Sequence, residues 1–402
     1  MAENKILKLH DNIQFIYELA LARLELQSLN VDFEITNNLR EFKLNFVDKI
    51  DLLKKSLAYF KSINGEFTDY HFIQQHNQTS SVNQYLTHWF YPYKGKFHPQ
   101  MIRALINIIG VNPGETILDP FIGSGTTALE CQLLGINCVG IDISPLCALI
   151  SRVKTESLGA LPEIEEAKDN FLMSVRPENG NLFQQGSLFS EKKSGDIKNK
   201  KVSNFFKLGE MIAHSDESRR GRDFQTSFIS NINKMLASLR DYKEVKSRLG
   251  LELGEVDIRQ GDARNLSVIN NKVHGIITSP PYSIALNYVA NDAHALTALG
   301  HNLDKIKEEF IGVRGAGFNK FELYNQDMDK AYRQMYSILE KGRYCVIVIG
   351  NVTFQSQEID TTAKVVEQCE SAGFALVKKI EKIIFGLYNI MQKEYILIFK
   401  KP

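Results

Sequence analysis

The spacing of hydrophobic residues divides the chain into a helical beginning, a body in which strands and helices alternate, and a polar interruption of that body. Residues 11–29 and 39–62 carry apolar side chains at intervals of three and four, which predicts helices. We therefore expect residues 1–87 to form a helical N-terminal extension. The stretch 88–110 begins with aromatic and basic side chains and continues as an amphipathic helix.

From Glu115 the pattern changes to short apolar runs separated by helical segments, which is typical of an α/β fold. Seven runs are predicted to be strands: 116–121, 137–143, 256–263, 273–280, 344–351, 375–385 and 394–401. The last two are close enough in the chain to form an antiparallel pair. The fold class is therefore a seven-stranded, doubly wound, Rossmann-like sheet. Residues 88–150 and 251–402 form its domain, and residues 151–250 form an inserted, mainly helical segment.

Composition narrows the class of protein without deciding its function. The 402 residues are 44% hydrophobic with a net charge of +1, as in an ordinary globular protein. The five cysteines form no CxxC pair, so neither a metal site nor a disulfide framework is indicated, and a reducing cytoplasm is expected. We find no apolar run long enough to span a bilayer and no signal-peptide core, so no membrane partner is expected.

A glycine turn between the first two predicted strands is the first candidate site. Gly123 and Gly125 allow a tight turn and a close ligand approach at a helix N-terminus. Asp142 ends the next strand, where a carboxylate can hold both ribose hydroxyls of a nucleoside. The turn has no Lys-Ser/Thr pair, so a nucleoside triphosphate is disfavoured, while a dinucleotide remains compatible with GSGTTA. Asp119 would repel a pyrophosphate and accept from an ammonium, which favours S-adenosylmethionine over NAD.

The sequence SPPY at 279–282 is the second candidate site, because it closes a predicted strand at the edge of the sheet where ligands bind. The Ser279 hydroxyl and a carbonyl of Pro280 or Pro281 could accept hydrogen bonds from an exocyclic base amine and localise its lone pair. Tyr282 offers a ring on which an extracted base could stack. The alternative is a turn that only ends the strand, with a surface tyrosine.

The motifs DPFIGSGTT, an acid after the second strand, GDA and TSPPY together resemble the amino-methylating DNA methyltransferases. The serine of TSPPY is most similar to the N4-cytosine branch, and YKGKFHP resembles the methionine-binding segment of the family. The resemblance implies a methyltransferase sheet, S-adenosyl-L-methionine as cofactor and direct methyl transfer to a flipped-out base. The implied cofactor-binding residues are Phe97, Asp119, Phe121, Gly123, Gly125, Thr126, Asp142 and Asp262, and the implied catalytic residues are Ser279, Pro280, Pro281 and Tyr282.

The resemblance further implies double-stranded DNA as partner and a restriction-modification setting with a cognate restriction endonuclease, in a prokaryotic cytoplasm. N4 of cytosine is the expected target, with N6 of adenine, an RNA or protein-glutamine amine, or a remote NAD-dependent oxidation as alternatives. The chain has no Pro-Cys dipeptide, which argues against ring-carbon methylation through a cysteine adduct. Residues 151–250 hold 18 Lys and Arg against 14 Asp and Glu, and are the candidate DNA target-recognition region. Arg219, Arg220 and Arg222 are its candidate DNA contacts, with a solvated loop as the alternative.

Overall fold

A seven-stranded sheet forms the centre of the computed structural model, which describes residues 5–36, 38–46, 49–174, 199–281, 288–315, 317–354, 357–383 and 393–402. Its strands are β6 (Thr116–Asp119), β7 (Asn137–Asp142), β8 (Val256–Gln260), β9 (Val273–Thr278), β10 (Leu339–Gly350), β13 (Ala375–Ile383) and β14 (Lys393–Lys400). They lie in the order β13-β14-β10-β9-β6-β7-β8. β14 runs antiparallel to β10 and β13, while the other neighbouring pairs are parallel. All seven predicted strands and the antiparallel pair are confirmed.

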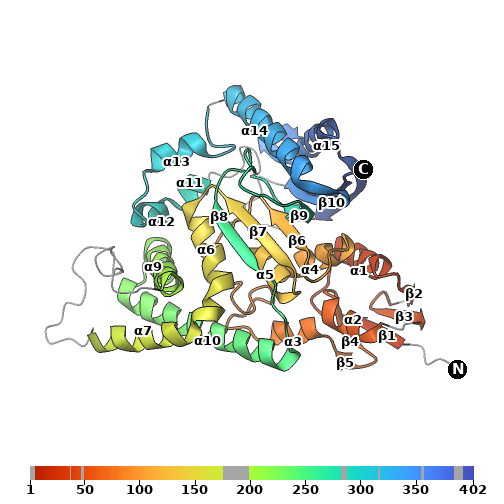
Figure 1. The fold of residues 1–402 in the computed structure, drawn as a ribbon, viewed down its shortest axis with the longest axis horizontal. Coiled ribbons are helices and arrows are strands. Elements are labelled where there is room, and N and C mark those ends of the chain that lie inside the picture. The colour runs from red at the N-terminus through yellow and green to blue at the C-terminus, as the bar shows by residue number, and fades with distance from the viewer. Residues whose placement is uncertain are drawn as a thin grey trace.

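Helices cover both faces of this sheet, which explains why its strands are apolar on both sides. On β9, Ile277 packs into one core and its neighbour Ile276 into the other. Helices α4 (Pro99–Ile108), α5 (Thr126–Leu133) and α6 (Pro145–Glu156) lie on the first face. Helices α14 (Gly317–Ile338) and α15 (Thr361–Ala372) lie on the second (Figure 1). The sheet is therefore doubly wound, as predicted.

The expected all-helical N-terminal extension is wrong for much of its length. Residues before α4 contain a five-stranded antiparallel sheet in the order β2-β3-β1-β4-β5. Its strands are β1 (Lys5–Leu9), β2 (Asp32–Ile35), β3 (Glu41–Phe46), β4 (Phe60–Ile63) and β5 (Glu66–Phe67), with helices α1 (Ile16–Ser28), α2 (Ile50–Ser56) and α3 (Asp69–Gln75). In β3, Phe42 and Leu44 are buried at every second position between partly exposed neighbours. Over so short a run, apolar residues at this spacing do not distinguish a strand from a helix, so the sequence pattern predicts the wrong element here.

The N-terminal residues are not a separate body, because they share a hydrophobic core with the large sheet. Leu21 and Leu26 of α1 belong to the same buried cluster as Ile396 and Ile398 of β14. Helix α1 packs against α4 and also contacts β13 (Figure 1). The N-terminal module thus braces the sheet at its β13–β14 edge.

The described part of the inserted segment is helical, as predicted. It contains η1 (Ser157–Ala160), α7 (Leu161–Ser174), α9 (Lys200–Arg220) and α10 (Phe224–Leu249), and α9 packs on both α10 and α6. After β9 come α11 (Tyr288–Asn291), α12 (Ala293–Ala298) and α13 (Leu303–Glu309), and the β11 (Val352–Phe354) and β12 (Gln357–Ile359) hairpin follows β10.

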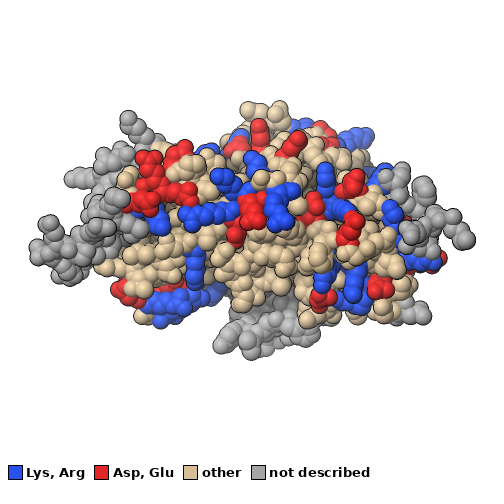
Figure 2. Space-filling model, turned by 90° about the horizontal axis from the view of Figure 1, so that it is seen from below, with Lys and Arg blue, Asp and Glu red and all other residues tan. Residues whose placement is uncertain are grey.

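Charged side chains of both signs are distributed over the surface that Figure 2 shows, consistent with the small net charge. Within the described ranges, no helix has the length and apolar character needed to cross a membrane. The five cysteines are buried as free thiols.

Candidate functional site

A cavity lies at the carboxyl edge of the large sheet, where β6 and β9 are neighbours but their chain connections leave in opposite directions. Such a switch point is the usual ligand-binding position in an open α/β sheet. The cavity brings together eight of the predicted site residues: Phe97, Phe121, Gly123, Thr126, Asp142, Asp262, Ser279 and Pro281. Residues from the segment before α4 and from the stretch α12–α13 also line it, including Tyr93, Lys96, Asp292, Leu296 and Phe310, as do Val348, Lys382 and Glu394 of the sheet.

The glycine turn between β6 and α5 adopts a conformation that favours glycine. Gly123 and Gly125 have φ angles of +49° and +77°, and a Cβ on Gly125 would lie 2.9 Å from the Ser151 Cα. Ser151 of α6 donates from its hydroxyl to the Gly123 carbonyl at 3.0 Å. Buried Lys154 donates to the Ser124 carbonyl at 2.7 Å. Helix α6 therefore fixes the turn from beneath, and Gly125 meets Ser151 rather than the cavity.

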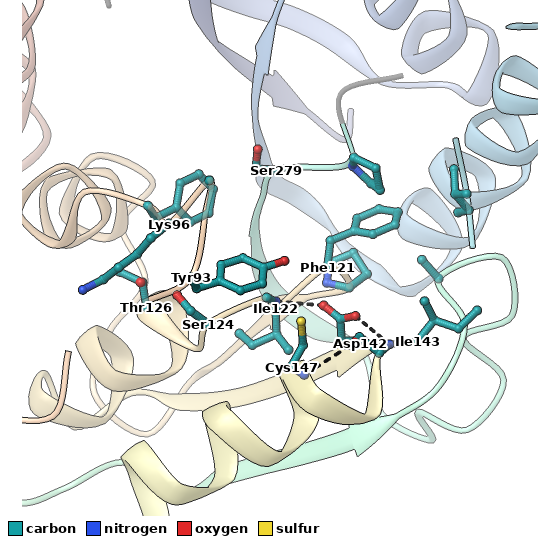
Figure 3. A pocket seen from close by; sticks show the side chains of 18 of the residues that line it. Tyr93, Lys96, Phe121, Ile122, Ser124, Thr126, Asp142, Ile143, Cys147 and Ser279 are labelled. Atoms are coloured by element: carbon teal, nitrogen blue, oxygen red, sulfur yellow. Dashed lines mark hydrogen bonds between the residues drawn. The ribbon is translucent and has the colours of Figure 1, made fainter. Parts of the chain in front are cut away.

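Asp142 is positioned at the end of β7 by two backbone donors. Its carboxylate oxygens accept from the Gly123 N–H and the Ser144 N–H, each at 2.9 Å. Burial raises the pKa of Asp142 to about 6, although these hydrogen bonds favour the charged form. Figure 3 shows the carboxylate at one side of the cavity, with Tyr93 and Phe121 between it and Ser279. A carboxylate held in this way keeps lone pairs for ligand hydroxyls.

Asp119 lies beneath the cavity instead of on its wall. Its carboxylate accepts from the Thr278 hydroxyl at 2.6 Å, the Thr127 hydroxyl at 2.7 Å and the Phe121 N–H at 3.1 Å. Only 1% of the residue is exposed, and burial raises its pKa to about 6. The expected contact with a ligand ammonium is thus not supported. Asp119 instead links β6 to β9 and α5, because it accepts hydrogen bonds from the hydroxyls of Thr278 and Thr127. The sequence alone does not show that these two threonines lie next to Asp119.

The Ser-Pro-Pro corner follows β9 directly, and Ser279 and Pro281 line the cavity while Pro280 is buried. The Pro281 carbonyl accepts from the hydroxyl of Tyr324 on α14 at 2.9 Å. This bond fixes the corner from the second face of the sheet. Tyr282 lies outside the described residues, so its predicted stacking role stays a prediction.

Asp262 follows β8 at the same edge as Asp142. Its carboxylate accepts from the Arg264 side chain at 2.6 and 2.9 Å and from the Arg264 N–H at 2.8 Å. Arg264 in turn reaches buried Asp327 at 3.2 Å. The carboxylate is a third exposed and lines the cavity, so it remains a candidate ligand contact held by an arginine.

The predicted DNA-contacting arginines lie at the end of α9 and not at the cavity. Arg219 donates to the Asn291 carbonyl at 2.9 Å, which ties α9 to the end of α11. Arg220 and Arg222 form ion pairs with Asp216 at 2.8 and 3.7 Å and are more than half exposed. Arg219 and Arg220 form the last turn of α9, which left-handed Gly221 closes, and Arg222 lies in the exposed link to α10.

Tyr93 and Lys96 line the cavity but are not among the site residues that the sequence predicts. Tyr93 approaches Gly123, since a Cβ there would lie 3.3 Å from the Tyr93 ring. Lys96 donates to the His88 carbonyl at 2.6 Å, and burial lowers its pKa to about 7. Both belong to the YKGKFHP stretch. Its resemblance to the methionine-binding segment of the family is the sequence feature that points to them. No feature of the sequence around Tyr324 indicates its role, because Tyr324 reaches the Ser-Pro-Pro corner from α14, 43 residues further along the chain.

Parts of the chain are similar in sequence to known methyltransferases. Residues 25–151 match a family model described as DNA methylase, for N6- and N4-amino methyltransferases. The chain is 49% identical over 69 residues to the Type II methyltransferase M.MjaII of Methanocaldococcus jannaschii, covering 17% of this chain and 13% of that protein. It is 26% identical over 325 residues to the Type II methyltransferase M.BsoBI of Geobacillus stearothermophilus, covering 65% of this chain and 62% of that protein.

The chain is therefore similar, over residues 25–151 and over the parts aligned with these two relatives, to the amino-methylating DNA methyltransferases. It spans less than two thirds of the length of either relative. A third relative, the tRNA (guanine(10)-N2)-dimethyltransferase of Methanothermobacter thermautotrophicus, is 44% identical over 55 residues, or 14% of this chain and 16% of that protein.

S-adenosylmethionine is the cofactor of this family, and the cavity fits it. Asp142 offers a carboxylate for ribose hydroxyls at the end of β7, and the glycine turn allows a close approach at the start of α5. Phe97 and Phe121 supply apolar walls. Within the described residues, no group of three or more His, Cys, Asp or Glu side chains could hold a metal ion, so these residues do not indicate a metal centre.

Proposed function

We propose that the chain transfers a methyl group from S-adenosylmethionine to the N4 amine of a cytosine flipped out of double-stranded DNA. The observation that carries this proposal is that Ser279 and Pro281 line the same cavity as Asp142, Phe121 and Gly123. The proposed acceptors for the amine and the proposed site for the donor nucleoside therefore lie in the same cavity. The proposed setting is a prokaryotic restriction-modification system with a cognate endonuclease.

The proposed chemistry needs only positioned acceptors and a nearby methyl donor. Bound S-adenosylmethionine would supply an electrophilic methyl group and leave as the neutral thioether. The Ser279 hydroxyl accepts from one amine hydrogen, and the Pro280 carbonyl accepts from the other. These bonds localise the nitrogen lone pair and stabilise the positive charge that develops on nitrogen, and the methylated nitrogen then releases one proton to solvent. Because Tyr324 holds the Pro281 carbonyl, the corner keeps its geometry during transfer.

The base must leave the duplex for this contact, because its amine cannot reach a buried cavity from within the stack. We assign the residues that would hold the donor as Asp142 for the ribose, Gly123 and Thr126 for the turn contacts, and Phe97 and Phe121 for packing. Asp262 is proposed to accept from the adenine amine of the donor. Arg220 and Arg222, exposed at the end of α9, are proposed phosphate contacts.

N6 of adenine is the second candidate for the acceptor, since the family includes both reactions. An RNA amine is a third, favoured by the similarity to a tRNA guanine-N2 methyltransferase. The test incubates the purified chain with S-adenosylmethionine carrying an isotopically labelled methyl group and with unmethylated DNA or tRNA. Mass spectrometry of the nucleosides should show labelled N4-methylcytosine in DNA. Labelled N6-methyladenine, or label in tRNA alone, would replace the cytosine assignment by the corresponding candidate.

A further inference from the structure

The cavity extends past Ser279 to the edge of the sheet formed by β10, β14 and β13. In strand order, its lining runs from Asp262 after β8 and Asp142 on β7, past Ser279 after β9, to Val348, Glu394 and Lys382 on β10, β14 and β13. Lys382 and Glu394 therefore lie on the opposite side of Ser279 from the two carboxylates proposed to hold the donor nucleoside. Two strand spacings of about 4.8 Å place β14 roughly 10 Å from β9 across β10, a separation on the scale of one base along the edge of the sheet.

Lys382 and Glu394 form a largely buried ion pair at this end of the cavity. They are direct partners in the β13–β14 register, and the Lys382 Nζ donates to a Glu394 carboxylate oxygen. Their side chains are only 18% and 11% exposed. Removing two charges from water is costly, and replacement by apolar residues is often neutral or stabilising. A buried pair at a cavity wall is therefore better explained by recognition than by stability.

A neighbouring pair on the same two strands shows the contrast. Glu381 and Lys393 lie 3.6 Å apart and are 48% and 47% exposed. Glu381 precedes Lys382 on β13, and Lys393 precedes Glu394 on β14. Their side chains therefore project from the opposite face of the sheet. This second pair does not line the cavity. Burial at the cavity thus distinguishes Lys382 and Glu394 from an ordinary exposed cross-strand pair.

We propose that Lys382 reads the target base and that Glu394 positions it, an inference that rests on the function proposed above. With the amine of cytosine at Ser279, the adjoining ring nitrogen and carbonyl oxygen are both hydrogen-bond acceptors that face β10 and β14. The Lys382 ammonium can donate to these acceptors while the Glu394 carboxylate holds its third proton and its charge. Adenine offers a single ring nitrogen followed by a C–H on that edge. The pair therefore selects cytosine over adenine.

The experiment measures steady-state methylation of unmethylated genomic DNA by the purified full chain, together with the Kd for S-adenosylmethionine by calorimetry. We expect Lys382→Met to lower kcat/KM for cytosine methylation by at least about 10- to 100-fold, which is the effect of losing one of its two charged hydrogen bonds to the base. Glu394→Gln should lower it by about 10-fold, and Glu394→Asp should restore part of the loss. The Kd for S-adenosylmethionine should stay within about twofold of wild type, since the pair lies beyond Ser279.

The matched controls are Lys393→Met and Glu381→Gln, which remove the exposed pair and should leave both quantities within about twofold. A charge-swapped Lys382→Glu/Glu394→Lys protein keeps an ion pair at the same place, which guards against a folding defect. We expect it to lose cytosine methylation as Lys382→Met does. If wild type methylates DNA and Lys382→Met or the swapped protein retains its rate, the base-reading role is wrong. If wild type methylates no base, it is the proposed function that fails.

Discussion

Replacing Asp142 by asparagine isolates the contact proposed to hold the donor ribose. In the structure, each carboxylate oxygen accepts one backbone N–H at 2.9 Å, from Gly123 and from Ser144. An asparagine has one oxygen and one NH2 group, so the NH2 must face one of these two donors. The variant therefore loses the negative charge, one ligand acceptor and the partner of one backbone N–H.

The magnitude follows from hydrogen bonds to charged groups, which contribute about 1.5–3 kcal/mol each. Loss of one such bond to a ribose hydroxyl should raise the Kd for S-adenosylmethionine about 10- to 150-fold. Isothermal calorimetry measures this Kd directly. Asp257→Asn is the matched control, because Asp257 lies on neighbouring β8 with a half-exposed carboxylate paired to Arg259 at 2.6 Å.

The pH dependence gives a second test of the same contact. Burial raises the pKa of Asp142 to about 6, so the carboxylate is charged above that pH and protonated below it. Affinity for S-adenosylmethionine should therefore fall as the pH is lowered through about 6, and the fall should be smaller in the Asp142→Asn protein, in which Asp119 is the remaining carboxylate with a pKa of about 6. A Kd for Asp142→Asn within twofold of wild type would refute the assignment of Asp142 to the ribose.

Three further changes test the turn and the corner. Ser279→Ala should lower kcat about 100- to 1,000-fold with little change in the Kd for S-adenosylmethionine, as expected for loss of a transition-state acceptor; a parallel rise in Kd would contradict that role. Gly125→Ala should lower the melting temperature and weaken cofactor binding, because its φ is +77° and the new Cβ would meet the Ser151 backbone at 2.9 Å. Tyr324→Phe removes the donor to the Pro281 carbonyl and should cost about 1 kcal/mol of stability and lower kcat. An unchanged kcat in Tyr324→Phe would show that the corner needs no support from α14.

The large sheet could be predicted because its strands are buried on both faces. A run such as Ile276–Ile277 sends successive side chains into two different cores, so the whole segment is apolar and ends abruptly at Ser279. The small N-terminal sheet could not be predicted in the same way. Its strands are only two to six residues long. Over that length, the spacing of Phe42 and Leu44 does not distinguish the period of a strand from that of a helix.

The site could be predicted only where function resides in a local motif. Asp142 ends β7, Ser279 follows β9 directly and Gly123 lies in the turn after β6, so strand order alone brings them to one edge. The roles of Asp119 and Tyr324 depend instead on partners 159 and 43 residues away. Such long-range hydrogen bonds are set by packing and leave no mark in the neighbouring sequence.

The central claim is that one cavity binds the methyl donor and acts on an exocyclic amine of DNA. The most direct measurement is nucleoside mass spectrometry of DNA from cells that express the wild-type chain, beside cells with an empty vector and cells that express Ser279→Ala. The account predicts N4-methylcytosine with wild type and none in either control. DNA without any new methylated base, or an equal amount of N4-methylcytosine with Ser279→Ala, would contradict it.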